Sequence, residues 1–345
     1  MLGAAVLAAV LTPLTASVAI ARGLLEQPGG HRSHVRATPN LGGVAIVVAF
    51  SLAVLIGAFA IPATGVDVEV IRLDLVTLLV AAVGISLVGL LDDRWDLSIA
   101  LRLSAMVLAA VALHLTGTGV AMTGVTGVDL VITVVWIVGV TNAFNLLDNM
   151  DGLSAGIAAI AAGFFWLLAT LNGQYLVAAL AAALAGVSLG FLRHNFHPAR
   201  TFMGDSGSLF LGFMLAALGI RLRFDPGQPQ DVAALVPILV LGVAVADTAL
   251  VTASRLARRR SPFAGGQDHI SHRLVRIGVP VPAAVGLIYA AAIAVGWLAL
   301  VVSRIDRGSA WLLAGFAMSL GVLLLGLLWR VPPEDAPAEA RARSG

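Results

Sequence analysis

Residues 130–153 read LVITVVWIVGVTNAFNLLDNMDGL. An apolar run long enough to cross a bilayer ends here in two amides and two carboxylates at three-residue spacing, namely Asn142, Asn145, Asp148 and Asp151. Ionisable groups beside lipid are costly, and they usually face a cavity, a partner or an ion. The stretch therefore predicts a transmembrane helix that ends in a functional site. The alternative is a solvated helix end without function.

The composition of the whole chain indicates that its solvent is mostly lipid. Hydrophobic residues make up 59% and charged residues 12% of the 345 residues, and the mean hydropathy is +0.98. These values predict an all-α, polytopic integral membrane protein. The chain has no cysteine, which excludes disulfides and thiolate metal sites. Its basic residues are all arginine and are spread over short connections, so we expect no nucleic-acid partner.

Eleven apolar windows have the length of a transmembrane helix, about 17 to 22 residues for a hydrocarbon layer of about 30 Å. They lie at residues 3–21, 41–62, 75–91, 103–121, 130–146, 153–171, 174–192, 207–223, 232–253, 281–302 and 310–329. The window at 207–223 is the weakest, because its apolar part ends at Ile220. Residues 331–345 carry prolines and mixed charges, and we expect a disordered cytoplasmic tail.

The arginines predict the orientation of the eleven spans. If the N-terminus lies outside, sixteen of the 21 arginines fall on cytoplasmic connections and five on the other side. This asymmetry is the positive-inside bias. It predicts an N-terminus outside, a C-terminus in the cytoplasm, and five connections with reactive polar residues gathered at the cytoplasmic face.

Two adjacent carboxylates, Asp92 and Asp93, follow the third window. Like charges this close repel one another unless a cation or a proton intervenes. Oxygen ligands in a chain without cysteine favour Mg²⁺ or Mn²⁺ over zinc. The pair therefore predicts a divalent-metal site, and the alternative is an exposed acidic turn paired with Arg94.

The opening stretch also predicts a break in its own helix. On a straight helix, Asp151 would point away from Asn142 and Asn145. A break near Asp148, which Gly152 favours, lets the carboxylates and amides turn toward one pocket. Amides donate and accept hydrogen bonds together, which suits a nucleobase or an acetamido sugar.

Two further motifs on the same face predict anion binding. Residues 202–208, FMGDSGS, place glycines, hydroxyls and Asp205 before a span, where a helix N-terminus binds phosphate or caps itself. Residues 267–273, QDHISHR, follow an arginine-rich segment that begins at Arg255. Imidazoles beside arginines form an anion-binding surface, although the arginines also fit the role of topology determinants.

Five motifs in this order resemble one family of membrane enzymes. They are Asp92-Asp93, the Asn-x-x-Asn-x-x-Asp-x-x-Asp-Gly-Leu run, Gly-Asp-Ser-Gly-Ser-Leu at 204–209, the span from Pro237 to Asp247-Thr248, and His-x-x-His-Arg-Leu at 269–274. Together they are similar to the polyprenyl-phosphate N-acetylhexosamine-1-phosphate transferases, glycosyltransferase family 4. The loop with Arg32-Ser33-His34 and Pro39-Asn40-Leu41-Gly42-Gly43 resembles the branch that uses UDP-N-acetylglucosamine more than the phospho-N-acetylmuramoyl-pentapeptide translocases.

The resemblance implies that residues 1–330 form a single transmembrane catalytic domain in the cytoplasmic membrane, with its active site on the cytoplasmic face. A sugar phosphate, with N-acetylglucosamine 1-phosphate the first choice, would pass from a UDP-N-acetylhexosamine to undecaprenyl or another polyprenyl phosphate. UMP would be released, and a lipid-linked cell-envelope glycan would be initiated. The implied cofactor is Mg²⁺, with Mn²⁺ as a substitute, and a homodimer is a further expectation.

The resemblance also implies roles for individual residues. Catalysis falls to Asp92, Asp93 and Asp205, and metal binding to Asp205, Asp92, Asp93 and Asp148. Substrate binding falls to Asn142, Asn145, Asp148, Asp151, Arg255, His269, His272, Arg273 and His34. A phosphate monoester has its second pKa near about 6, so the acceptor is largely dianionic at neutral pH. Direct attack, with Asp92 organising the acceptor, is therefore preferred over a covalent aspartyl intermediate.

Departures from the family pattern leave the sugar open. Ser271 stands where a histidine is common, and Gly266 stands where an aspartate is common. The same reaction with UDP-N-acetylmuramoyl-pentapeptide or another UDP-sugar is therefore an alternative. A CDP-alcohol phosphatidyltransferase would share the motif that begins at Asp148, but Gly156 replaces its arginine. A secondary transporter would place its site near the membrane midplane rather than at one face.

Overall fold

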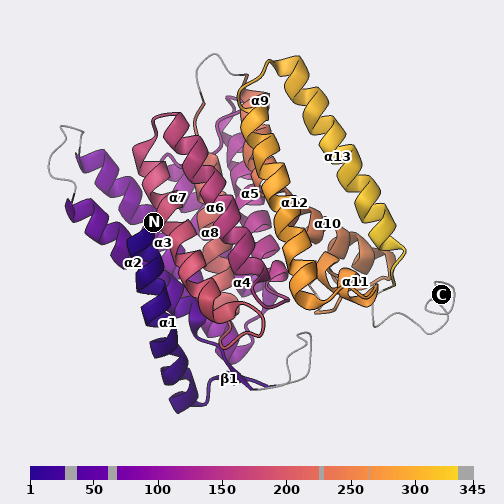
Figure 1. Ribbon diagram of the computed structural model, residues 1–345. Coiled ribbons are helices and arrows are strands. Elements are labelled where there is room, and N and C mark those ends of the chain that lie inside the picture. Colours follow the sequence, from indigo (N-terminus) through magenta and orange to yellow (C-terminus); the bar gives the residue numbers. More distant parts are fainter. Residues whose placement is uncertain (28–36, 61–67, 225–228, 264, 333–345) are drawn as a thin grey trace.

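The computed structural model describes residues 1–27, 37–60, 68–224, 229–263 and 265–332 (Figure 1). Helices dominate, as the composition predicts. Their bounds are α1 (Leu2–Arg22), α2 (Gly42–Ala60), α3 (Val68–Trp95), α4 (Ile99–Leu115), α5 (Thr126–Leu147), α6 (Leu153–Leu171), α7 (Tyr175–Asn195), α8 (Gly204–Arg221), α9 (Gln230–Val240), α10 (Gly242–Ala257), α11 (Ile270–Arg276), α12 (Val281–Val302) and α13 (Arg307–Trp329). Two short antiparallel strands, β1 (Leu25–Glu26) and β2 (Thr38–Pro39), are the exception to the all-α prediction.

The described helices make this a multi-pass membrane protein. Seven of them are long and apolar enough to cross a bilayer, and the bent pair of α9 and α10 would form an eighth span. The helices α2 and α4 are apolar but shorter. The predicted residue His34, and the predicted tail from residue 333 onward, lie outside the described residues.

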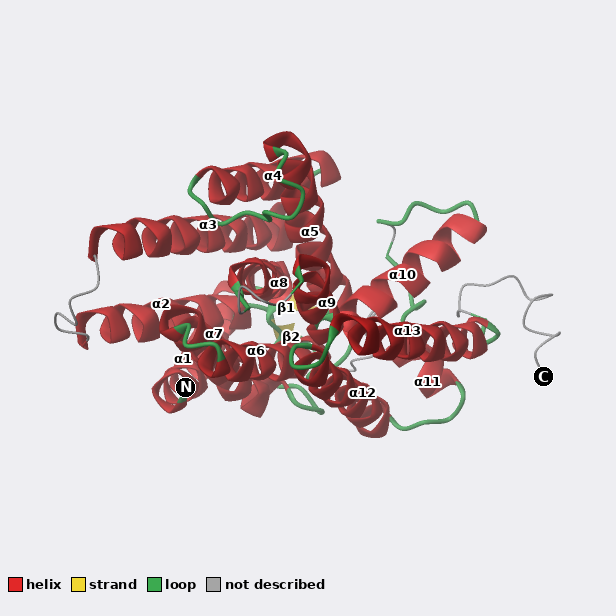
Figure 2. Cartoon of the chain, turned by 90° about the horizontal axis from the view of Figure 1, so that it is seen from above, coloured by secondary structure: helices red, strands yellow, loops and turns green. Residues whose placement is uncertain are grey.

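Helix α8 lies in the middle of the bundle, as Figure 2 shows. It contacts α2, α3, α5, α6 and α7, and nearly all of its residues are buried. A helix surrounded by other helices needs no broad apolar surface for lipid, and small or hydroxyl side chains let its neighbours approach closely. The weakest of the predicted windows is therefore the most enclosed helix, and Asp205 lies in its first turn.

The predicted break in the opening stretch is confirmed. Helix α5 ends at Leu147 and α6 begins at Leu153, and Gly152 adopts a positive φ of 77° that favours glycine. The Tyr289 hydroxyl donates to the Gly152 carbonyl oxygen, and the Gly152 amide donates to Asn195 Oδ1. The break is therefore held by side chains of two other helices.

The apolar window at 232–253 corresponds to two helices, α9 and α10, rather than to one continuous helix. The chain bends by 74° between α9 and α10, at Leu241. Figure 2 shows α10 running away from the bundle. Asp247 follows the bend, in the second turn of α10, and its side chain is buried.

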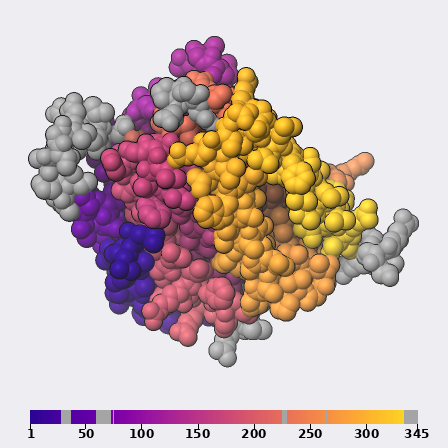
Figure 3. Space-filling view, turned by 45° about the horizontal axis from the view of Figure 1, so that its top comes forward, coloured from indigo at the N-terminus to yellow at the C-terminus, as the bar shows by residue number. Residues whose placement is uncertain are grey.

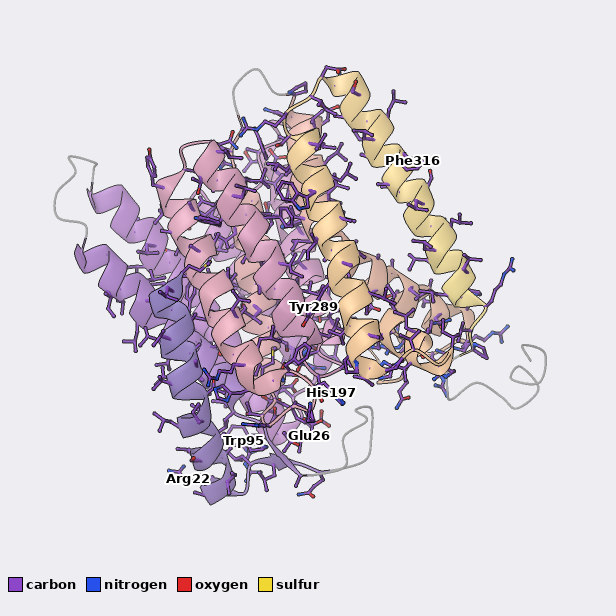
Figure 4. The ribbon with its side chains drawn as sticks, viewed as in Figure 1. Arg22, Glu26, Trp95, His197, Tyr289 and Phe316 are labelled. Carbon is purple, nitrogen blue, oxygen red and sulfur yellow. The ribbon has the colours of Figure 1, made fainter. Side chains whose placement is uncertain are left out.

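Helix α13 diverges from the rest of the bundle (Figures 1 and 3). Its first turns are joined to α9, because Arg307 and Trp311 donate to Asp231 Oδ2. Many of its large apolar side chains are exposed, and Phe316 points away from the protein (Figure 4). Such a surface suits contact with lipid.

The contact of α3 with the start of α8 depends on Gly89. A Cβ on Gly89 would lie 2.5 Å from the carbonyl carbon and oxygen of Asp205, whereas a Cβ on Gly84 of the same helix would meet nothing within 4 Å. We expect Gly89→Ala to lower the free energy of unfolding by about 1 to 3 kcal/mol, because α3 must shift. Gly84→Ala is the matched control and should be neutral or stabilising. Thermal unfolding in detergent measures both variants, and an equal response would contradict this packing.

Candidate active site

Four helices bring polar side chains together at one end of the bundle. The end of α3 supplies Asp92 and Asp93, the first turn of α4 supplies Arg102, the end of α5 supplies Asn145, and the first turn of α8 supplies Asp205. Arg102 Nη1 lies 2.5 Å from Asp92 Oδ2 and 3.5 Å from Asp205 Oδ2, so one nitrogen contacts both carboxylates. The two acidic motifs therefore share one centre, which we call the acidic site.

Asp93 has a different environment from its neighbour Asp92. Its two carboxylate oxygens accept the backbone N–H groups of Asp205 and Ser206, at 3.0 and 3.3 Å. These groups belong to the first turn of α8, which no side chain of its own N-cap satisfies. The sequence predicted that this helix N-terminus either binds phosphate or is capped by its own residues. In the structure, Asp93 of α3 caps it. Gly204, at φ +62°, leaves room for the Asp93 carboxylate.

Asp92 is buried and holds Arg102 in place. Its Oδ1 accepts the Leu97 backbone N–H at 2.7 Å, and its Oδ2 accepts Arg102. Sequence reasoning assigned no role to Arg102. Its place in the first turn of the helix that follows the Asp-Asp pair was the signal that could have found it. Asp205 is the more open partner, with 28% of its side chain exposed.

The polar residues of the opening stretch differ in their surroundings. Asn145 Nδ2 donates to Asp205 Oδ1 at 2.9 Å and to Ser208 Oγ at 3.1 Å, so Asn145 belongs to the acidic site. Asn142 instead donates to the Val138 carbonyl oxygen inside α5. Asp148 is the C-cap residue of α5.

Asp151 and Asn149 connect the break after α5 to other loops. Asp151 Oδ2 accepts His197 Nδ1 at 2.9 Å and the Ala199 backbone N–H at 3.0 Å. Figure 4 labels His197 at the same end of the bundle as the acidic site. Asn149 Oδ1 accepts the Ser271 hydroxyl at 2.6 Å, which ties α11 to the break. Sequence reasoning assigned no role to Asn149, His197 or Ser271.

The arginine-rich segment forms a buried ion-pair cluster. Asp268 accepts Arg255 Nε at 2.7 Å and Arg258 Nη2 at 2.8 Å. Burial alone would raise the pKa of Asp268, but the ion pairs with Arg255 and Arg258 outweigh it and lower that pKa. Asp268 therefore stays ionised and fixes both guanidinium groups. Arg255 Nη2 is buried and has no hydrogen-bond partner among the described residues.

The two predicted histidines lie close together beside this cluster. The rings of His269 and His272 are 5.8 Å apart between centroids. His269 Nδ1 lies 2.7 Å from Asp247 Oδ2, and both side chains are buried. Sequence reasoning named Asp247 only as the end of a family motif and gave its side chain no role.

Arg273 is held by protein groups on every side. Its Nη1 contacts the carbonyl oxygens of Leu328 and Val331 at the end of α13, and its Nη2 donates to Ser254 Oγ. Its Nε donates to the Asp268 carbonyl oxygen. These bonds satisfy carbonyl groups that a helix end leaves unpaired. They place Arg273, predicted to bind substrate, in a structural contact between α11 and α13.

The acidic site suits a hard cation in its donor chemistry. Among the described residues, no three carboxylate or histidine side chains are grouped as a metal site. Mg²⁺ does not need three, because it typically keeps waters and binds one or two carboxylates with substrate phosphates. The convergence of Asp92 and Asp205 on one nitrogen of Arg102 marks a position that favours positive charge.

The fold and the site thus define a multi-pass membrane protein with an acidic site and a buried cluster of arginines and histidines. A family model, described as glycosyl transferase family 4, matches residues 75–223. The chain is 32% identical over 291 residues to a probable undecaprenyl-phosphate N-acetylglucosaminyl 1-phosphate transferase of Bacillus subtilis, covering 81% of this chain and 77% of that protein.

Two further relatives agree with that match. A decaprenyl-phosphate N-acetylglucosaminephosphotransferase of Mycolicibacterium smegmatis is 33% identical over 91% of this chain and 84% of its own length. A phospho-N-acetylmuramoyl-pentapeptide-transferase of Bacillus mycoides is 31% identical over 64% of this chain and 69% of its own length. The chain belongs to glycosyl transferase family 4, as its motifs predicted.

The contacts of Arg273 lead to a test of its role. Arg273→Lys removes the planar group that contacts several carbonyl oxygens at once. We expect the free energy of unfolding to fall by about 1 to 3 kcal/mol, with no change in the KM for a UDP-sugar. Arg330→Lys, at the exposed end of α13, is the control. A raised KM with unchanged thermal stability would instead support the predicted role in substrate binding.

Proposed function

We propose that this protein transfers N-acetylhexosamine 1-phosphate from a UDP-sugar to a polyprenyl phosphate. The observation that carries the proposal is the convergence of Asp92, Asp205 and Asn145 around Arg102, in a chain whose relatives bear names of that activity. An acidic site beside buried arginines suits a reaction between two phosphate-bearing substrates.

The reaction is a displacement at phosphorus. An oxygen of the polyprenyl phosphate attacks the phosphorus that carries the sugar, the bond from that phosphorus to the bridging oxygen breaks, and UMP leaves with the bridging oxygen. The acceptor is largely dianionic at neutral pH, so the attack needs no strong base. The two anionic substrates repel each other, and positioned cations stabilise the charge that develops on UMP.

Each group of the site has a part in this scheme. Arg102, oriented by Asp92, neutralises charge at the acidic site, and Arg255 offers its unpaired Nη2 to a phosphate oxygen. Asn145 orients Asp205 through Oδ1. Asp205, with Asp92, would hold Mg²⁺, and the bound ion would supply neutralisation of phosphate charge. We assign Asp93 to the support of α8 rather than to the metal.

The proposal also covers the sugar donor and the orientation of the protein in the membrane. We infer that the donor is UDP-N-acetylglucosamine, because the names of the Bacillus subtilis and Mycolicibacterium smegmatis relatives specify N-acetylglucosamine. The alternative donor is a UDP-N-acetylmuramoyl-pentapeptide, because the name of the Bacillus mycoides relative specifies phospho-N-acetylmuramoyl-pentapeptide. Eleven spans with the N-terminus outside would place the acidic site at the cytoplasmic face of the cytoplasmic membrane, which the arginine distribution supports.

The proposal is tested by measuring UMP. Purified protein is incubated with Mg²⁺, undecaprenyl phosphate and a panel of UDP-sugars, and N-acetylglucosamine should be the preferred sugar. We expect Asp205→Asn and Asp92→Asn to lower the rate of UMP release by about 100-fold or more, because charge stabilisation at the site is lost.

Asp231→Asn is the matched control, since Asp231 pairs with Arg307 where α9 meets α13 and takes no part in the acidic site. Its rate should equal that of the unmodified protein. Absence of UMP with every donor, or full activity in Asp205→Asn, would overturn the proposed function.

A further inference from the structure

Asp247 and His269 form a buried pair that the proposed reaction does not yet use. Asp247 Oδ2 lies 2.7 Å from His269 Nδ1, and Asp247 Oδ1 accepts the Ile270 backbone N–H at 2.7 Å. Asp247 is 2% exposed and His269 is 3% exposed. One carboxylate therefore fixes both the ring of His269 and the backbone of the next residue.

The bend between α9 and α10 creates this pair. Asp247 lies in the second turn of α10, after the 74° change of direction, and His269 is the N-cap residue of α11. Ser271, two residues after His269, donates to Asn149 in the break between α5 and α6. The ring of His269 is thus anchored on one side by α10, while its helix is anchored to the loop that follows Asn145.

The hydrogen bond determines where the proton of the imidazole resides. An ionised carboxylate can only accept, so Nδ1 must donate to Asp247. In the neutral ring, Nε2 then carries a lone pair and no proton. Among the described residues no hydrogen bond engages Nε2. Of the two ring nitrogens, Nε2 is therefore the one that no described residue occupies.

We propose that Asp247 is a positioning residue, which keeps the proton of the His269 ring on Nδ1 so that Nε2 of the neutral ring accepts a hydrogen bond from the bound substrate. The group it meets carries a proton, such as a hydroxyl of the sugar, the imide N–H of uracil or a protonated phosphate oxygen. A fully ionised diphosphate would offer Nε2 nothing to accept. This inference rests on the proposed function and refines the role of the histidine motif within it.

The variant that separates orientation from packing is Asp247→Asn. The amide has the same shape, and its Oδ1 can still accept the Ile270 N–H. Its Nδ2 then faces His269 Nδ1, which must accept, so the ring proton moves to Nε2. A carboxylate-to-amide change beside a catalytic histidine lowers activity by selecting the wrong tautomer in serine proteases. We expect the kcat for UMP release to fall at least about tenfold by the same cause.

Nitrogen NMR of protein labelled with ¹⁵N-histidine reads the tautomer directly. Spectra are recorded in detergent at alkaline pH, where histidine rings are neutral, and the His269 signals are assigned as those missing from His269→Gln. The unmodified protein should show a protonated Nδ1 and a bare Nε2, and Asp247→Asn should show the reverse. Thr248→Val is the control, because the Thr248 hydroxyl only donates to the Ala244 carbonyl oxygen within α10, and both its spectrum and its rate should be unchanged.

Several results would contradict the role of Asp247. A protonated Nε2 in the unmodified protein, or the same tautomer in Asp247→Asn, overturns the inference, as does a tautomer change that leaves the rate intact. If Asp247→Asn unfolds at the same temperature as the unmodified protein and loses activity without a tautomer change, Asp247 acts by another route and the inference fails. Absence of UMP from the unmodified protein would refute the proposed function, while the NMR comparison would still locate the proton.

Discussion

The start of α8 is the constraint on which the rest of the structure depends. A helix that begins inside a bundle exposes N–H groups that lipid cannot satisfy, so protein groups must do so. Asp93 supplies this acceptor from the end of α3, and Gly89 and Gly204 leave the space that it needs. Because Asp93 has to reach α8, its neighbour Asp92 is brought to Asp205.

The capping contact therefore creates the acidic site as well as supporting the fold. Two carboxylates in a partly buried position repel each other, and Arg102, whose Nη1 contacts both, offsets part of that repulsion. The basic cluster repeats this arrangement with the signs reversed, since Asp268 lies between Arg255 and Arg258. In the acidic site, the charged residues come from three separate helices, α3, α4 and α8.

Local features of the fold could be predicted from the sequence, because their signals lie within short stretches of chain. The lengths of the apolar windows indicate the helices, the arginines between them indicate the orientation of the helices, and Gly152 indicates the break after α5. The resemblance was carried by motifs that are also local. Asp92, Asp205 and Asn145 were expected at one site and lie together.

Pairings between distant segments could not be predicted in this way. Nothing near Asp93 shows that its partners are the amides of Asp205 and Ser206, more than a hundred residues later. The bend at Leu241 lies within an apolar run, where Pro237 was its only local signal, so Asp247 was assigned to a span and not to His269. Arg273 was read as an anion-binding residue from its motif, whereas the end of α13 that it contacts lies more than fifty residues away.

The central claim is that Asp92 and Asp205 face one cation position, whereas Asp93 supports the helix. Binding of Mn²⁺ to the purified protein, followed by electron paramagnetic resonance, tests this claim most directly. The account predicts one site whose affinity falls at least about tenfold in Asp205→Asn and in Asp92→Asn, and which Asp231→Asn leaves unchanged. Equal Mn²⁺ affinity in Asp205→Asn and the unmodified protein would contradict it.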